Sequence, residues 1–310
     1  MAEPFRHCEL PLSVWPTAQQ TSHTQRTGRY LPESTAHPAR MLPATARRAI
    51  EAYTAPGDLV LDPMCGIGTT LVEAIYLGRR AVGVEYEPRW ADLARANLID
   101  AEASGATGEG QVRTGDARKL ARLVDPDLAG RVGLVLTSPP YGASLHGQVR
   151  ARPGQGVAKA DCAYSADRAN LAHVGTDKLL AGFTEILAAC AGLLRPGGIV
   201  AVTARPWREH GALVDLPSAV LAAGEAAGLI PYERLVALLV GLRGDTLVPR
   251  ASFFALDQVR KSRRRGCPLR VIAHEDVLVL RKPEIRAGSG RSKELRPEAG
   301  RPASTPVVAP

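Results

Sequence analysis

The sequence lacks any closely spaced pair of cysteines, since its 5 cysteines are scattered over 310 residues without a CxxC pair. This spacing argues against a disulfide framework and a structural zinc site, so we expect a reducing, cytoplasmic environment and no metal. No stretch approaches the roughly 18 uninterrupted apolar residues of a membrane span. The N-terminus also lacks a basic start followed by an apolar run, so we expect neither secretion nor membrane insertion.

Acidic residues are fewer than basic ones: the chain has 31 Asp and Glu and 39 Lys and Arg, which gives a formal net charge of +8. This excess favours a polyanionic partner or substrate over an acidic one, although many basic proteins bind no nucleic acid. Hydrophobic residues make up 45% of the chain, enough to bury the core of one sizeable domain with some length left over.

The composition changes at residue 37 and again at residue 284. Residues 1–36 are rich in Thr, Gln, Ser and Pro without a clear period, and we expect an irregular arm there. Residues 284–310 are rich in Pro, Ala, Gly, Arg and Ser, and we expect a disordered tail. Between residues 37 and 283, strand patterns occur at 58–62, 80–85, near 112, and at 132–136, 199–203, 235–242 and 276–281. Helical patterns occur at 42–53, 69–77, 89–101, 179–194 and 216–227.

This alternation predicts an α/β fold: a doubly wound, mostly parallel seven-stranded sheet with helices on both faces. In such a fold, ligands bind beyond the carboxyl ends of the strands. Loops that follow the predicted strands are therefore expected to share one site.

A glycine-containing loop, Asp62-Pro63-Met64-Cys65-Gly66-Ile67-Gly68-Thr69-Thr70, follows the first predicted strand and opens a helix. Glycines allow the backbone to approach a ligand, and a helix N-terminus offers free N–H groups, so the loop suits many nucleotides. Glu85 ends the next strand, where a carboxylate can accept hydrogen bonds from ribose hydroxyls, and Asp116 follows the third strand on the same edge. Taken alone, Glu85 could equally be a solvated strand end.

The fourth strand ends in Thr137-Ser138-Pro139-Pro140-Tyr141-Gly142. Two prolines fix the backbone and remove two N–H donors, which leaves the oxygens of Ser138 and Pro139 available as acceptors. An exocyclic amine needs such acceptors for its protons while its nitrogen pyramidalises. Tyr141 is suited to stacking on a base drawn out of a duplex. Alone, Pro-Pro-Tyr could be a rigid turn, but its place after a cofactor loop favours the functional interpretation.

At these strand ends the chain resembles the class I S-adenosylmethionine-dependent methyltransferases. The resemblance implies that Gly66 and Gly68 approach the methionine portion of the cofactor, that Glu85 binds ribose and that Asp116 meets adenine. A dehydrogenase is disfavoured, because Cys-Gly-Ile-Gly-Thr-Thr stands where a nicotinamide or flavin fingerprint would have GxGxxG.

Ser-Pro-Pro-Tyr further resembles the motif of the DNA amino-methyltransferases, the N4-cytosine and N6-adenine family. Three other segments are similar to that family as well: the cofactor loop, the segment His37-Pro38-Ala39-Arg40 and the closing strand at 274–282. The resemblance implies that His37-Pro38-Ala39-Arg40 helps to hold methionine. It spans residues 37 to 282. It implies a domain over 37–283 that methylates double-stranded DNA, with cytosine N4 favoured over adenine N6 by Ser138. Many relatives with such a loop have the two halves permuted, which leaves the subgroup open. The implied catalytic residues are Ser138, Pro139, Pro140 and Tyr141, and the implied cofactor residues are His37, Pro38, Asp62, Pro63, Cys65, Gly66, Gly68, Thr69, Thr70, Glu85 and Asp116.

Two alternatives stay open. RNA guanine-N2 methyltransferases also carry Asp-Pro-Met-Cys-Gly loops and Pro-Pro-Tyr, but they usually have an RNA-binding domain upstream and Asp before Pro-Pro. A nucleic-acid-binding protein that kept the fold and lost turnover is the other alternative, and the intact motifs argue against it.

Two basic inserts interrupt the predicted domain, at 142–178 and 243–274. The second insert has a net charge of +6 with histidine neutral. If residues 235–242 form a strand parallel to the fifth strand, this insert begins at the same edge of the sheet as Ser138. Such inserts can bind phosphates, although a mobile surface loop and a solvated charge run are the plainer interpretations. The predicted nucleic-acid-binding residues are Arg150, Arg152, Arg260, Lys261, Arg263, Arg264 and Arg265.

Overall fold

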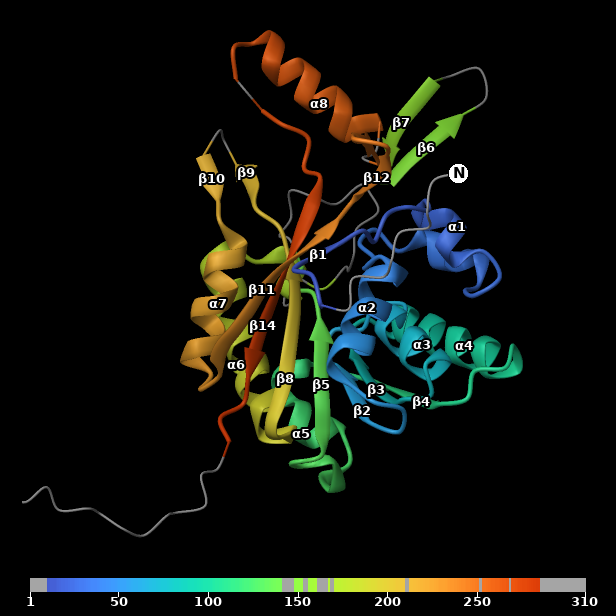
Figure 1. Ribbon diagram of the computed structural model, residues 1–310, viewed down its shortest axis with the longest axis vertical. Helices are drawn as coiled ribbons and strands as arrows, with labels where there is room; N and C mark the ends of the chain where they lie inside the picture. The colour runs from blue at the N-terminus through green and yellow to red at the C-terminus, as the bar shows by residue number, and fades with distance from the viewer. Residues whose placement is uncertain are drawn as a thin grey trace, which may run out of the picture.

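The computed structural model describes residues 10–140, 148–152, 156–160, 167, 170–209, 212–250, 253–267 and 269–284. At its centre is an eight-stranded sheet with the order β1-β11-β14-β8-β5-β2-β3-β4 (Figure 1). Neighbouring strands are parallel except for β14, which runs antiparallel to both β8 and β11. The sheet strands are β1 (Val14–Trp15), β2 (Leu59–Asp62), β3 (Arg80–Glu85), β4 (Glu109–Thr114), β5 (Val132–Thr137), β8 (Leu194–Ala204), β11 (Ile230–Leu238) and β14 (His274–Arg281).

Helices cover both faces of the sheet (Figure 1). Strand residues alternate between the two faces: Val60 packs in the cluster with α2, α3 and α4, whereas Leu59 and Leu61 pack in the cluster with α5, α6 and α7. All of β2 is buried, as a central strand of a doubly wound sheet must be. The helices are α2 (Pro43–Tyr53), α3 (Thr69–Tyr76), α4 (Pro88–Ala103), α5 (Leu120–Leu123), α6 (Thr176–Leu193) and α7 (Leu216–Ala226).

The predicted α/β fold is confirmed, and most element boundaries agree within a few residues, but the sheet has eight strands instead of seven because β1 pairs at its edge. The sixth predicted strand, at 235–242, is displaced: β11 covers Ile230–Leu238, and Val240–Arg243 forms a separate strand, β12. β11 is parallel to β8, as expected, because β14 between them is antiparallel to each.

The N-terminal arm differs from the expectation of irregular structure. Its described part contains β1, the helix α1 (Ser22–Arg26) and a 3-10 helix at Pro32–Ala36. Trp15 and Tyr30 are buried in the core cluster beneath α2, α3 and α4. The arm is therefore held by apolar burial that its polar composition does not reveal. The predicted tail at 285–310 lies outside the described residues.

Several smaller elements extend beyond the carboxyl ends of the parallel strands, at the top of Figure 1. They come from the two predicted inserts and from the chain after β8. They form three two-stranded sheets and one helix. These elements are β6 (Gln148–Arg152) with β7 (Gly156–Ala160), β9 (Trp207–Glu209) with β10 (Ala212–Val214), β12 with β13 (Thr246–Pro249), and α8 (Phe253–Arg264).

Candidate active site

A cavity of about 480 Å³ opens at the carboxyl ends of β2, β3, β4 and β5. Its size is that of a site for a ligand as large as a nucleotide cofactor. The structure brings together at this cavity nearly all of the predicted cofactor residues and the described part of the Ser-Pro-Pro turn. The predicted residues that line it are His37, Pro38, Asp62, Pro63, Cys65, Gly66, Thr69, Thr70, Glu85, Asp116, Ser138, Pro139 and Pro140.

The loop after β2 is held by Asp62, whose side chain is buried. Its carboxylate accepts hydrogen bonds from the Thr70 hydroxyl at 2.7 Å and from the Met64 amide at 3.1 Å. Burial raises the pKa of Asp62 to about 6, and these hydrogen bonds act in the opposite direction. Asp62 therefore fixes the backbone of the loop through Met64 and connects the loop to the first turn of α3 through Thr70.

Both loop glycines have left-handed backbone angles, with φ of +54° at Gly66 and +82° at Gly68. A Cβ on Gly66 would lie 3.2 Å from Nε2 of His37, so only glycine fits without displacing the imidazole. Gly68 precedes the first residue of α3 and does not line the cavity; a Cβ there would lie 3.2 Å from Cβ of Ala94. The missing side chain of Gly66 thus leaves room for the His37 imidazole at the cavity wall, and that of Gly68 lets α4 pack close to the start of α3.

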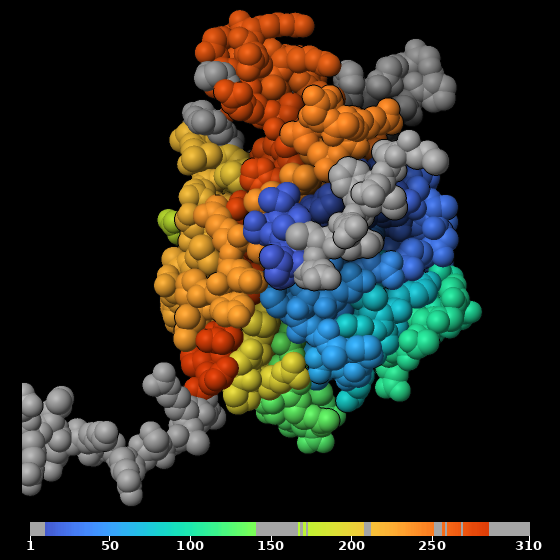
Figure 2. Space-filling model, in the orientation of Figure 1, coloured from blue at the N-terminus to red at the C-terminus, as the bar shows by residue number. Residues whose placement is uncertain are grey.

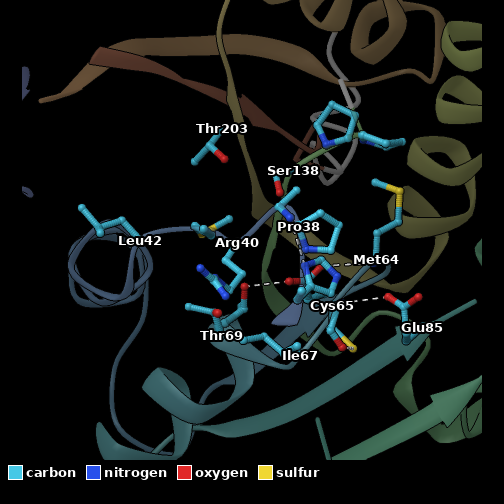
Figure 3. Close-up of a pocket in the computed structure, with 18 of the residues that line it drawn as sticks. Pro38, Arg40, Leu42, Met64, Cys65, Ile67, Thr69, Glu85, Ser138 and Thr203 are labelled. Carbon is cyan, nitrogen blue, oxygen red and sulfur yellow. Dashed lines mark hydrogen bonds between the residues drawn. The ribbon is translucent and has the colours of Figure 1, made fainter. Parts of the chain in front are cut away.

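Glu85 at the end of β3 is buried, with 1% of its surface exposed. One carboxylate oxygen accepts the Gly66 N–H at 2.8 Å, and the other accepts the Glu87 N–H at 2.9 Å. Figure 3 shows Glu85 reaching toward the loop beside Cys65. The Glu85 carboxylate therefore fixes the backbone of the loop at the cavity wall.

Asp116 follows β4 and pairs with a residue that the sequence analysis did not select. Arg118 forms an ion pair with it at 2.7 Å, and both residues line the cavity. Partial burial acts to raise the pKa of Asp116, but the hydrogen bonds and the charge of Arg118 outweigh it and lower the pKa below the usual value. Asp116 is consequently ionised at neutral pH and presents an acceptor to the cavity.

His37 and Pro38 reach the cavity from the segment before α2. The imidazole is buried and contacts the Trp90 ring edge-on, with 4.7 Å between the ring centroids. Burial lowers the pKa of His37 to about 3, so the ring is neutral under ordinary conditions. In Figure 3, Pro38 lies between Ser138 and Cys65, which places this segment between the loop and the Ser-Pro-Pro turn.

The Ser-Pro-Pro turn begins where β5 ends at Thr137. Pro139 is buried, and its neighbours Ser138 and Pro140 are half-buried at the cavity wall. The turn therefore presents oxygen atoms beside the cofactor loop. Tyr141, the last residue of the predicted motif, lies outside the described residues.

One side of this cavity is formed by residues that were not predicted from the sequence. These residues come from the N-terminal arm and from the far strands of the sheet, and no local motif marks them. The sequence signal that could have indicated some of them is position, because several follow the ends of β8, β11 and β13. They are Ala18, Gln20, Thr21, Ser22, Thr203, Arg205, Leu239, Arg250 and Glu275.

The predicted nucleic-acid-binding residues lie in or directly after two of the smaller elements beyond the sheet. Arg150 and Arg152 belong to β6, and the five others belong to α8 and the turn after it. These five are exposed, and one of them, Lys261, forms an ion pair with Asp257 at 2.7 Å. Among the described residues, no cluster of three or more His, Cys, Asp or Glu is able to hold a metal, and no helix is long and apolar enough to span a membrane.

The strand order, the loop after β2 and the acidic strand ends define a class I methyltransferase fold. Within that class, residues 6–96 of the chain match the family model described as DNA methylase. The family resemblance of the sequence is thereby confirmed.

Three relatives illustrate the similarity. The chain is 34% identical over 131 residues to the DNA adenine methyltransferase YhdJ of Escherichia coli, covering 41% of this chain and 42% of the relative. It is 33% identical over 114 residues to a tRNA (guanine(10)-N2)-dimethyltransferase of Methanocaldococcus jannaschii, and this region is 35% of this chain and 30% of the relative. It is 38% identical over 93 residues to the type II methyltransferase M.ScaI of Streptomyces caespitosus, and this region is 30% of this chain and 29% of the relative. The chain thus spans less than half the length of each.

Proposed function

We propose that the chain transfers a methyl group from S-adenosylmethionine to the exocyclic amine of a base in double-stranded DNA, with cytosine N4 the first target and adenine N6 the next. The observation that carries this proposal is that the Ser-Pro-Pro turn and the Asp62–Thr70 loop line one cavity. Direct transfer requires the methyl donor and the acceptor amine to lie in contact. The family match supports the same activity.

The cavity residues fit the parts of S-adenosylmethionine. Glu85 offers acceptors to ribose hydroxyls, Asp116 offers an acceptor to the adenine amine, and Gly66 lines the space where the methionine portion would lie. Neutral His37 packs beside that space without adding charge. The bound cofactor supplies an activated methyl group. We assign to its site His37, Pro38, Asp62, Pro63, Cys65, Gly66, Gly68, Thr69, Thr70, Glu85 and Asp116.

The Ser-Pro-Pro-Tyr motif would hold the target amine. As the nitrogen gains its new bond to carbon, its protons become acidic, and the oxygens of Ser138 and Pro139 accept hydrogen bonds from them. Pro140 fixes the turn, and Tyr141 stacks on the extruded base. No covalent intermediate is required, because the nitrogen attacks the methyl group directly.

The basic elements beyond the carboxyl ends of the strands would bind the nucleic-acid backbone. α8 extends from the same end of the sheet as the cavity (Figure 1), so a duplex whose base enters the cavity would reach it. Its cations bind phosphates without reading sequence. The proposed phosphate-binding residues are Arg150, Arg152, Arg260, Lys261, Arg263, Arg264 and Arg265.

The proposal keeps residues 37–283 as the methyltransferase domain, with inserts at 142–178 and 243–274. Cytoplasmic location is part of the same proposal, since the scattered cysteines suit a reducing compartment.

A second candidate function is methylation of guanine N2 in tRNA or rRNA. The similarity to the Methanocaldococcus jannaschii tRNA methyltransferase supports it, and a guanine N2 amine needs the same acceptors. The third hypothesis, a nucleic-acid-binding relative without turnover, predicts that the protein does not bind S-adenosylmethionine.

Product identification separates these functions. Purified protein and labelled S-adenosylmethionine are incubated separately with unmethylated DNA and undermodified RNA, and digested nucleosides are identified by mass spectrometry. N4-methylcytosine or N6-methyladenine from DNA supports the proposal and identifies the base. N2-methylguanosine from RNA alone would replace it with the second candidate.

A further inference from the structure

Arg250 lies where three parts of the molecule meet. It follows β13 directly, its exposed side chain lines the cavity, and its Nη2 donates a hydrogen bond to the carbonyl of Gln19 at 3.0 Å. The guanidinium also covers Gly241, where an added Cβ would lie 3.1 Å from Nη2. Arg250 therefore links the hairpin β12–β13, the N-terminal arm and the cavity.

The part of the arm that it contacts, residues 13–26, is called the N-terminal strap here. One end of the strap is fixed to the sheet edge: the Val236 N–H donates to the Ser13 carbonyl at 2.8 Å, and the Thr17 hydroxyl donates to the Leu238 carbonyl at 2.9 Å. In Figure 2 the blue strap and the orange hairpin occupy adjoining parts of one face.

The other end of the strap is fixed to α2. The side-chain amide of Gln25 donates to the Thr17 carbonyl at 2.9 Å, and its oxygen accepts the Ala44 N–H at 2.9 Å. Between these anchors, Ala18 and the residues 20–22 line the cavity. The strap thus forms part of the cavity wall and connects α2 to the hairpin β12–β13.

The charge of Arg250 is available to a ligand. Several other arginines form ion pairs, such as Arg118 with Asp116 and Arg234 with Asp276, whereas no carboxylate in the described part of the chain forms an ion pair with Arg250. A guanidinium has five N–H donors, and the hydrogen bond to Gln19 uses only one of them. The remaining donors suit two phosphate oxygens in a fork arrangement.

We propose that Arg250 is a substrate-positioning residue: it binds the phosphate that flanks the target nucleotide while it holds the strap at the cavity wall. This inference rests on the proposed methyl transfer to a nucleic acid. It differs from the general attraction of α8, because Arg250 lies on the cavity wall, where a fixed phosphate would set how deeply the base enters.

The test compares Arg250→Gln with Arg243→Gln. Arg243 ends β12 in the same hairpin, is exposed and does not line the cavity, so its substitution removes the same charge. Both variants should weaken the salt dependence of DNA binding by a similar small amount, since each removes one cation. Only Arg250→Gln should raise KM for DNA by about tenfold, the loss expected for a charged hydrogen bond, while its Kd for S-adenosylmethionine stays within about twofold of the wild type. Arg250→Lys should restore KM only in part, because lysine lacks the fork.

Equal effects of Arg250→Gln and Arg243→Gln on KM would overturn the inference, leaving Arg250 as one charge among many. Loss of cofactor binding in Arg250→Gln would also overturn it, since the residue would then be structural. Wild-type protein that transfers no methyl group to DNA or RNA would instead overturn the proposed function itself.

Discussion

The Glu85 carboxylate accepts the backbone N–H of Gly66 across 2.8 Å, and this bond joins the end of one strand to the loop of its neighbour. β2 and β3 are parallel and adjacent, so their carboxyl ends meet at one edge. The bond fixes the loop backbone at the point where a Cβ would already contact His37. The protein's own hydrogen bonds therefore fix the backbone of the loop at the cavity.

Gly66→Ala should weaken S-adenosylmethionine binding by at least about tenfold, because the added Cβ collides with His37 and strains a left-handed backbone. The matched control is Gly57→Ala, where φ is +86° but a Cβ would meet nothing within 4 Å. Calorimetry should show normal cofactor affinity in the control, with only some loss of stability. Equal affinity losses in both variants would show that backbone strain alone, not the contact in the cavity, is responsible.

Asp62 should make the free energy of unfolding depend on pH. Its pKa is raised from 3.8 to about 6 in the folded protein, so the folded state holds this proton more tightly than the unfolded state. The resulting stabilisation is complete below about pH 4 and is lost as pH rises through about 6. Asp62→Asn removes this dependence. Urea unfolding should therefore show the variant gaining about 1–3 kcal/mol relative to wild type between pH 4 and 7. A constant difference across this range would mean that Asp62 does not titrate there.

The N-terminal arm should contribute to stability through a buried polar cluster. Tyr30 donates to the Glu73 carboxylate at 2.8 Å, and Arg29 pairs with the same carboxylate at 2.8 Å. Tyr30→Phe leaves that buried carboxylate one donor short, and we expect a loss of about 1–3 kcal/mol in the free energy of unfolding. The control Tyr232→Phe changes a half-exposed ring and should alter stability by less than about 0.5 kcal/mol. If the two variants are equally stable, the arm is not held by this cluster.

Much of the site could be predicted because its residues follow strand ends in sequence. The order of Asp62, Glu85, Asp116 and Ser138 along the chain, each at or just after the carboxyl end of a strand, is sufficient to place them on one edge of a parallel sheet. Gly68 stays a predicted cofactor residue; it does not line the cavity, and its left-handed turn also permits α4 to pack close to α3.

The opposite wall could not be predicted because tertiary contacts bring it there. β1 has only two residues, too few for any period, and its place depends on pairing with β11 more than 200 residues later. The first half of β11 is exposed and carries charges, which hides the strand pattern and moved the prediction toward Leu242. Arg118 and Arg250 belong to no motif, and only the fold places them beside the cavity.

The most direct test of the central claim, that one cavity holds both the cofactor and the target amine, is Ser138→Ala measured for binding and for transfer. Calorimetry with S-adenosylmethionine should give the wild-type Kd, whereas the rate of methyl transfer to DNA should fall by about tenfold to a hundredfold, because an acceptor for the amine protons is lost. Ser104→Ala, at the exposed end of α4, is the matched control and should change neither quantity. Unchanged transfer in Ser138→Ala, or loss of binding and transfer together, would contradict the division between cofactor loop and Ser-Pro-Pro turn.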